Sequence, residues 1–421
     1  MNSRCIRGWG YRAAVNLDLT DDERSFRDEA RTWLREHLPT EPRPPEGPEM
    51  REFDLAWQRT LHDGGWAGIN WPREYGGRGL SDIQQMIWYE EFALADPPFT
   101  LNNSCTFVGN NHGGPTLIAC GDEDQKAEHL PPILRGEVVW CQGFSEPGAG
   151  SDLASLSTRA VLSEGTGADG GDEWVVDGQK VWTSNAQYAD FGILVARTDP
   201  EVPKHEGLTF FILDMSSEGV EVRPLVQAQG VAHFNEVFLT EVRIPAANVV
   251  GEVGDGWRVA RTTLRSESSM ISGAGQATPF TAVLDLARRR GLTDDPVVRQ
   301  RLAGVYTDEL VLRWMGWRSQ TAVMQGRHDL ALHGSLLKNF FTRSFRRKVE
   351  LAVDVEGAEG LLWDDAEGSG FWQYQFLNQF ASRIGGGTDE VHRNNLGEQV
   401  LGLPREPSAD RDLPWSQTTR A

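Results

Sequence analysis

The chain has 421 residues, which is enough for two or three packed units of ordinary domain size. Its formal net charge is −20, with 61 acidic against 41 basic side chains, and this balance argues against nucleic acid or an anionic membrane as the main partner. The four cysteines form no C-x-x-C pair and have no histidine spacing suited to zinc, so we expect no disulfide framework, no metal site and a reducing, cytoplasmic location.

The first third of the chain is predicted to be helical. Residues 1–16 have no clear pattern, and residues 17–135 form the expected N-terminal helical domain. Its first helix begins in TDDERSFRDEA, where Thr20 and Glu23 have the spacing of a capping box. Further helices are expected after Asp54, after Ser81 as a candidate N-cap, and over residues 122–130.

From residue 136 to residue 253 the pattern changes to short strand-like runs separated by turn residues, which predict a middle antiparallel β domain. The runs are EVVWCQGF, STRAVL, EWVVDGQKVWTS, FGILVAR, LTFFILD, EVRPLV and NEVFLTEVRIP. All are far too short to span a bilayer, so no membrane contact is expected. Residues 254–407 return to helical periods and predict a C-terminal helical bundle, and residues 408–421 form a polar tail that we expect to be loosely ordered. The expected fold class is therefore α+β.

Common catalytic signatures are missing from the sequence. There is no G-x-G-x-x-G after a strand, no G-x-x-x-x-G-K-[ST] and no H-E-x-x-H, which disfavours Rossmann, P-loop and zincin enzymes. In QGFSEPGAGSD, Ser145 resembles a nucleophile elbow, but Pro147 stands where the G-x-S-x-G turn needs glycine. A serine hydrolase is therefore not favoured.

The same stretch fits a loop that leaves a strand and exposes backbone N–H groups to a polar or anionic ligand. About thirty residues on, KVWTSN places Trp182 and Ser184 on one face of a strand, which suits a flat heterocycle. Alone, each motif is explained at least as well by a glycine-rich turn beside a core tryptophan. Near the C-terminus, RIGGGTDEVHRNN could cradle a phosphate or be an ordinary loop with Thr388 as a helix N-cap.

Taken together, these stretches resemble the acyl-CoA dehydrogenase family of flavoproteins. The segments INWPREYGGRGLS, WCQGFSEPGAGSD, GQKVWTSNAQYAD and GGGTDEVHRNNLGEQVLGLP stand in the family's order and spacing, and the resemblance covers residues 19–407. It implies an FAD enzyme that removes a proton from Cα and a hydride from Cβ of an acyl-CoA, the hydride passing to flavin N5, to give the trans-2-enoyl thioester. It also implies an electron-transfer flavoprotein or similar acceptor, and a homo- or heterotetramer.

By matching position, the resemblance assigns the flavin ring to the middle domain. Phe144 and Ser145 would bind the pyrimidine end of the flavin, Trp182 would pack on the ring system, and Ser184 would bond near N5. Ser151 matches a position that touches the CoA portion of the substrate.

The resemblance assigns the dinucleotide half of FAD to the C-terminal domain. Thr388 and Glu390 fall where the family binds adenine or pyrophosphate, and Gly357 and Gly360 match a segment that clamps FAD from a neighbouring subunit. Arg288 of LARRRG is expected to assist, although its spacing departs from the family's R-x-x-F-G form.

The catalytic base is not where many members carry it. Their I-Y-E-G-T motif reads IGGGT here, so Gly386 replaces the carboxylate, while its N–H would still donate to the thioester carbonyl and leave room for a branched or bulky acyl group. A subset of the family places the base on the first long helix of the C-terminal domain, and Glu267 falls at that position, with Ser268 replacing the usual arginine. Burial there would raise the pKa of the base. Arg265 matches a position near CoA.

Other readings remain open. Glu267 could be an ordinary solvated glutamate, and the chain could then be a non-catalytic partner subunit of a hetero-oligomeric acyl-CoA dehydrogenase. An oxygen-using flavin oxidase or monooxygenase on the same fold is a third alternative. The stretches GRGLS and LTDDPVVRQRLA look most like the bacterial branch that handles branched, aromatic or steroid side-chain thioesters, some members of which are heterotetramers of two related chains.

Overall fold

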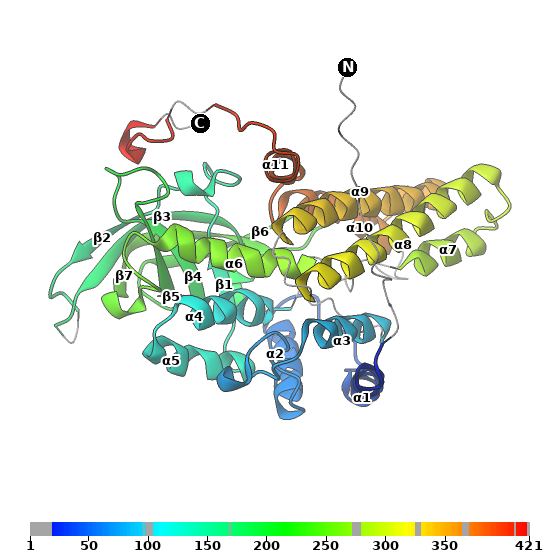
Figure 1. Cartoon of the computed structure of the whole chain (residues 1–421), viewed down its shortest axis with the longest axis horizontal. Coiled ribbons are helices and arrows are strands. Elements are labelled where there is room, and N and C mark those ends of the chain that lie inside the picture. The colour runs from blue at the N-terminus through cyan, green and yellow to red at the C-terminus, as the bar shows by residue number, and fades with distance from the viewer. Residues whose placement is uncertain are drawn as a thin grey trace, which may run out of the picture.

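The computed structural model describes residues 19–95, 97, 104–167, 170–271, 279–324, 330–363, 370–407 and 410–418, excepting the side chains of 265–271, 320, 323–324 and 330–333. Figure 1 shows helices of the N-terminal region along one side, the β-strands at one end and the long C-terminal helices at the other. The order of helices, sheet and helical bundle along the chain is the predicted one, and the α+β fold class is confirmed.

The N-terminal region holds five α-helices within its described residues: α1 (Asp21–His37), α2 (Pro48–Asp63), α3 (Asp82–Leu94), α4 (Gly114–Cys120) and α5 (Glu123–Leu134). The predicted capping box starts α1, since the Thr20 hydroxyl accepts from the Glu23 N–H at 3.2 Å and the Glu23 carboxylate accepts from the Thr20 N–H at 2.7 Å. Ser81 caps α3 as expected. By contrast, α2 begins six residues before Asp54, because Pro48 is favourable in the first helical turn.

The middle region forms one seven-stranded sheet in the order β1-β4-β2-β3-β7-β6, with β5 also paired to β4. The strands are β1 (Trp140–Gly143), β2 (Arg159–Ser163), β3 (Glu173–Ser184), β4 (Phe191–Arg197), β5 (Leu208–Asp214), β6 (Val220–Leu225) and β7 (Phe234–Pro245). Most pairs are antiparallel as expected, but β1 pairs with β4 in parallel, and so does β2 at one position. The purely antiparallel expectation is corrected for these two pairs.

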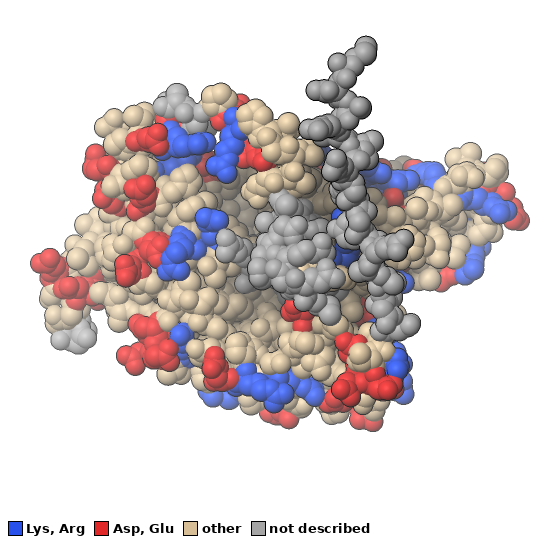
Figure 2. Space-filling model, viewed as in Figure 1, with Lys and Arg blue, Asp and Glu red and all other residues tan. Residues whose placement is uncertain are grey.

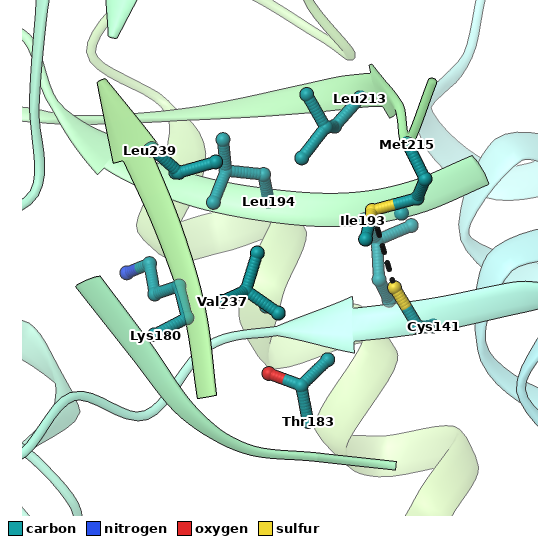
Figure 3. Close-up of a pocket in the computed structure, with 11 residues that line it drawn as sticks. Cys141, Lys180, Thr183, Ile193, Leu194, Leu213, Met215, Val237 and Leu239 are labelled. Carbon is teal, nitrogen blue, oxygen red and sulfur yellow. Dashed lines mark hydrogen bonds between the residues drawn. The ribbon is translucent and has the colours of Figure 1, made fainter. Parts of the chain in front are cut away.

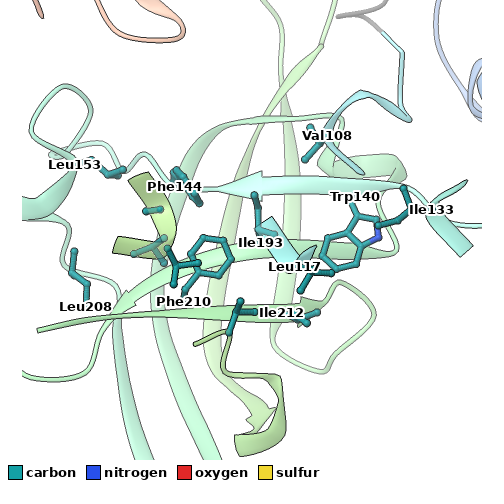
Figure 4. Packing of buried hydrophobic residues seen from close by; sticks show 14 of the residues in the cluster. Val108, Leu117, Ile133, Trp140, Phe144, Leu153, Ile193, Leu208, Phe210 and Ile212 are labelled. Carbon is teal, nitrogen blue, oxygen red and sulfur yellow. The ribbon is translucent and has the colours of Figure 1, made fainter. Parts of the chain in front are cut away.

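The continuous apolar runs of β4 and β5 are explained by burial on both faces of the sheet. Successive side chains of a strand point to opposite faces. Ile193 of β4 joins a cluster that reaches α5 and the first C-terminal helix, and Figure 4 shows this packing. Its neighbour Leu194 joins a second cluster inside the curled sheet. The middle region is therefore wedged firmly between the helical regions on one side.

The C-terminal region contains α6 (Gly256–Ile271), α7 (Phe280–Arg289), α8 (Pro296–Met324), α9 (Leu330–Glu356), α10 (Phe371–Ile384) and α11 (Asp389–Asn395) among its described residues. The predicted helical stretch 257–287 is divided into α6 and α7, and the predicted stretch 388–401 changes after α11 into a π-helix over Leu396–Val400. None of the described helices is both long and apolar enough to cross a membrane.

The last described segment docks on the middle region. The Trp415 side chain is buried, its indole N–H donates to the Ser155 carbonyl at 3.3 Å, and its ring lies 4.3 Å from the Arg197 guanidinium. The Trp415 backbone N–H also donates to the Val202 carbonyl at 2.9 Å. Residues 410–418 are thus attached to the protein surface, contrary to the expectation of a loosely ordered tail.

The charge distribution gives no extended basic surface on the face seen in Figure 2, where acidic and basic side chains are interspersed. The net charge of −20 is therefore spread over several small acidic groups on that face.

Candidate active site

The structure brings together the two middle-domain motifs that the sequence analysis singled out. The Ser145 carbonyl, in the loop after β1, accepts from the Val181 N–H of β3 at 2.9 Å. The Lys180 ammonium donates to the Phe144 carbonyl at 3.1 Å. Because Trp182 and Ser184 follow on the same strand, the four predicted flavin-ring residues lie in one neighbourhood. Phe144 itself is buried, with its ring edge-on to Phe210 at 5.9 Å.

A buried ion pair fixes this junction. The Lys180 ammonium lies 2.8 Å from the Glu146 carboxylate, and neither side chain is exposed by more than a tenth. Glu146 also accepts from the backbone N–H groups of Ser157 at 2.6 Å and Thr158 at 2.9 Å. Burial raises the pKa of Glu146, but Lys180 and these donors outweigh burial and hold the pKa below its ordinary value. Burial in turn lowers the pKa of Lys180, against the attraction of Glu146.

Trp182 has the local structure of a ligand-contacting residue. Its backbone φ is +61°, a left-handed conformation that costs free energy for a side chain of this size, and 58 % of the residue is exposed. The β3–β7 register shifts between Lys180 and Thr183, so a β-bulge turns Trp182 out of the regular pleat. Its ring rests edge-on against Phe234 at 5.9 Å. A strained, exposed tryptophan gains nothing for the isolated fold, which favours a binding role.

Two polar groups near this junction lack a hydrogen-bond partner in the described structure. They are the side-chain oxygens of Gln142 on β1 and Asn185 directly after β3. Buried polar atoms in native proteins are almost always paired, so an unpaired oxygen signals an absent ligand or water. Gln142 shares its strand face with Trp140, two residues earlier. The sequence analysis missed Gln142, although its place directly before the GFSEP loop was a usable signal.

A third unpaired group, the Thr183 hydroxyl, has a simpler explanation. It lines a closed pocket inside the curled sheet with Lys180, Cys141 and Met215, as Figure 3 shows. The pocket has a cavity volume of about 10 Å³, which is room for one water molecule. It is therefore a packing gap and not a cofactor site.

The glycine loop is built against α9. Gly386 and Gly387 have φ values of +67° and +89°, a conformation that glycine adopts without strain. The Gly385 carbonyl accepts from Lys338 at 2.6 Å and the Gly386 carbonyl from His392 at 2.9 Å. These carbonyl bonds hold the loop against α9 and α11, which fixes where the Gly386 N–H lies.

The residues after the loop have ordinary structural partners. Thr388 is the N-cap of α11, with its hydroxyl accepting from the Val391 N–H at 3.1 Å. Glu390 is exposed and pairs with Arg393 at 3.0 Å. The N-cap alternative of the sequence analysis is therefore confirmed for Thr388, and its predicted cofactor role stays a prediction.

The other predicted cofactor residues lie elsewhere in the same chain. Arg288 is exposed near the end of α7 and pairs with Asp285 at 2.8 Å. An ion pair between Arg290 and Glu359 places the Gly357 segment beside this end of α7. Figure 1 shows α7 at the opposite end of the molecule from the sheet. One chain alone does not bring Arg288 and Gly357 to the Ser145–Trp182 junction.

The predicted base and CoA residues are only partly described. Ser151 is exposed in the loop after β1. Arg265 and Glu267 lie on the helical backbone of α6, but their side chains are outside the described part.

Comparison with known proteins decides the family. The chain matches three consecutive family models: acyl-CoA dehydrogenase N-terminal domain over residues 20–137, middle domain over 141–242 and C-terminal domain over 254–401. The chain belongs to the acyl-CoA dehydrogenase family. Enzymes of this family are FAD-dependent oxidoreductases, and the chain is an enzyme of that class.

Acyl-CoA dehydrogenases named for steroid chemistry are among its relatives. The chain is 39 % identical to acyl-CoA dehydrogenase IpdE1 of Mycolicibacterium smegmatis over 395 residues, which cover 90 % of this chain and 98 % of the relative. Among solved structures it resembles the Tcur3481-Tcur3483 steroid ACAD, with a TM-score of 0.80, 32 % identity and 93 % and 100 % of the two chains covered. The ChsE4-ChsE5 complex from Mycobacterium tuberculosis gives a TM-score of 0.78 at 31 % identity, with 93 % and 100 % covered.

The residues at the junction fit the flavin of an acyl-CoA dehydrogenase. An exposed indole offers a flat apolar surface, the loop after Ser145 offers backbone N–H groups, and the Gln142 and Asn185 oxygens lack partners. A fused ring system carrying N–H and carbonyl groups satisfies all three features at once.

Proposed function

We propose that this acyl-CoA dehydrogenase binds FAD at the Ser145–Trp182 junction and converts an acyl-CoA thioester to its trans-2-enoyl product. The exposed, left-handed Trp182 carries the proposal, because the fold alone gives no reason to hold a large apolar side chain in that conformation. The relatives named for steroid substrates support a branched or bulky acyl group.

The residues of the chain would divide the chemistry among them. When bound, FAD would accept the hydride that leaves Cβ. Glu267 on α6 would take the proton from Cα as a general base. The Gly386 N–H would donate to the thioester carbonyl and so stabilise the negative charge that develops there, and the absence of a side chain would leave room for the acyl group.

Anaerobic titration of the purified protein with a panel of straight, branched and ring-bearing acyl-CoAs tests this function. Loss of the oxidised flavin absorbance together with an enoyl product is the expected result for at least one bulky thioester. A yellow protein that no thioester reduces would contradict the proposal and favour a non-catalytic partner subunit. Rapid reoxidation of the reduced flavin by air would instead favour an oxidase.

Substitution of Trp182 separates cofactor binding from folding. Trp182→Ala and Trp182→Gly are both expected to weaken FAD binding about tenfold, because the stacking surface is lost. Only Trp182→Gly relaxes the left-handed backbone, so its apoprotein should be more stable than that of Trp182→Ala, by roughly 0.5–1 kcal/mol. FAD fluorescence titration and urea unfolding of the apoprotein measure the two effects. Trp314→Ala, at a tryptophan that is 54 % exposed on α8, is the control and should change neither.

An apolar surface at the end of α9 supports assembly into an oligomer. Leu361 and Leu362 are 86 % and 62 % exposed, and Trp363 and Phe371 beside them are also exposed. Exposed apolar groups of this kind mark protein–protein contacts. Because this surface adjoins Gly357, the partner would meet the segment predicted to clamp FAD across subunits.

Substitution of this surface tests the oligomer. Leu361→Asp combined with Leu362→Asp is expected to lower the mass measured by light scattering to that of a smaller assembly, and to weaken FAD binding in parallel. Val161→Asp, at an exposed position of β2, should leave the mass unchanged. An unaltered mass in the double variant would exclude this surface as the contact. Assembly only with a second, related chain would show a heteromer.

A further inference from the structure

A short π-helix in the N-terminal domain packs against α6, the helix of the proposed base. It spans Gly109–Gly113 with the sequence GNNHG and continues directly into α4. Both segments lie against α6. A π-turn inside a helix changes the direction of the side chains it carries and is frequent at functional sites, but it needs further evidence before a role can be assigned.

Two tryptophans fix the position of this turn. A side chain at Gly114 would overlap the Trp71 ring, with its Cβ only 1.9 Å away, and one at Gly113 would lie 3.1 Å from the Trp140 ring. The Trp71 indole N–H also donates to the Asn110 carbonyl at 2.8 Å. The backbone of the turn is therefore held by rigid neighbours, and so is the direction in which it leads the chain.

Two contacts set the register between α4 and α6. The Thr116 and Thr263 hydroxyls are hydrogen-bonded at 2.8 Å, and both residues are fully buried. One turn later on α4 and about one turn earlier on α6, the Arg258 guanidinium reaches the Cys120 sulfur at 3.7 Å. The two helices therefore run antiparallel. A direct bond between two short side chains also means that the helix backbones approach closely.

Continuing this register places His112 opposite residue 267. His112 precedes Thr116 by four residues, and residue 267 follows Thr263 by four. On α6, the fully buried Val259 and Thr263 define the face turned toward the N-terminal domain, and residue 267 continues the same four-residue spacing.

His112 is an unusual side chain for such a position. It is 5 % exposed, and its ring lies edge-on to Phe107 at 5.2 Å. Histidine can donate and accept hydrogen bonds from its two ring nitrogens, so it can hold a carboxylate or a polar group of a ligand in one orientation. An apolar residue would fill the same space without that property.

Resting on the proposed function, we infer that His112 is a positioning residue: its imidazole orients the carboxylate of Glu267 for removal of the Cα proton. The base would then be held jointly by the C-terminal domain, which carries it, and by the N-terminal domain, which fixes its direction. Such support from a neighbouring group matters because small misplacements of a catalytic group cost large factors in rate.

Paired cysteines test the geometry without reference to activity. His112→Cys combined with Glu267→Cys is expected to form a disulfide on mild oxidation, identified by peptide mapping, because residues opposed across closely packed helices can meet the Cα separation that a disulfide requires. His112→Cys combined with Ser268→Cys is the control, since residue 268 lies about 100° away around α6. Equal cross-linking in both pairs, or none with Glu267→Cys, would overturn the register.

Kinetics of flavin reduction test the positioning role. His112→Phe is expected to lower the limiting rate of reduction by a thioester about tenfold to a hundredfold, with bound flavin unchanged and the apparent thioester affinity changed much less. His112→Gln should recover part of the rate, because an amide can still hydrogen-bond, and it serves if the Phe variant folds poorly. His129→Gln, at a buried histidine of α5, is the matched control.

Three outcomes distinguish the explanations. A weaker apparent affinity with an unchanged limiting rate would make His112 only a wall of the substrate site and would overturn the inference. A loss in His129→Gln equal to that in His112→Gln would show a stability effect and would also overturn it. If no thioester reduces the wild-type flavin, the proposed function fails, and with it the role of His112, while the cysteine pairs still report the geometry.

Discussion

Replacement of Glu267 by glutamine is expected to lower the rate of flavin reduction by a thioester by about 10²- to 10⁴-fold, which is the usual contribution of a general base. Glutamine keeps the size and hydrogen-bonding capacity of the side chain but cannot take a proton. FAD content and thioester binding should be nearly unchanged, because the proposed flavin contacts lie on the middle domain. The loss should therefore fall on the rate and not on affinity.

Stopped-flow absorbance under anaerobic conditions measures that rate. A second readout is exchange of the Cα hydrogens in deuterated water, using a thioester analogue whose Cβ carries no hydrogen, because such exchange requires the base alone. Glu221→Gln, at an exposed glutamate paired with Arg223, is the control. Normal reduction by Glu267→Gln would exclude this residue as the base and would leave a group outside α6 to be found.

Replacement of Lys180 by methionine is expected to destabilise the protein by about 3–5 kcal/mol, because the Glu146 carboxylate would remain buried without its cation. The double variant with Glu146→Gln should recover much of that loss, since the uncompensated charge is removed. Urea unfolding of the apoprotein measures both variants. Arg159→Met, which breaks the exposed pair with Asp177 on the same sheet, should matter far less.

The same pair predicts a dependence on pH. Because the pKa of Glu146 is held below its ordinary value, its contribution to stability is complete above the pKa of an unfolded glutamate, about 4.3, and is lost as the pH falls through the folded value. Below about pH 4 the wild type should therefore lose more stability than the Lys180→Met, Glu146→Gln double variant. Parallel acid titrations of the two proteins would show the pair to be unimportant.

FAD binding should fall with the same substitution. The Lys180 ammonium also donates to the Phe144 carbonyl, so its loss frees the loop that carries Ser145. A stability loss without weaker FAD binding would mean that the pair supports the sheet and not the proposed cofactor site.

Much of the fold could be predicted from local sequence signals. The strands β3, β4 and β5 have the bounds of their predicted runs, because β-branched and aromatic residues there are interrupted by turn residues. The parallel pairing of β1 with β4 could not be predicted in this way, since it depends on which strands meet after the chain has turned twice. The π-turn before α4 likewise depends on the rings of Trp71 and Trp140, which lie far away in the sequence.

The candidate site was predictable to a similar extent. The closeness of Ser145 and Trp182 follows from motifs that the sequence displays, but the left-handed backbone of Trp182 follows from a bulge against β7. His112 was missed because its only local signal is GNNHGG, a glycine-flanked polar run inside an otherwise helical stretch. Its importance comes from the packing of α4 on α6, which no local pattern encodes.

The docking of Trp415 has a consequence for how the molecule is completed during synthesis. Arg197 in β4 bonds the carbonyls of Ala154 and Leu156, and Trp415 covers it from the far end of the chain. Domains made first by the ribosome generally fold first. The middle domain must therefore wait, with Arg197 uncovered beside the Ser151 loop, until the last residues emerge. Its final contact forms only after the C-terminal helices have been made.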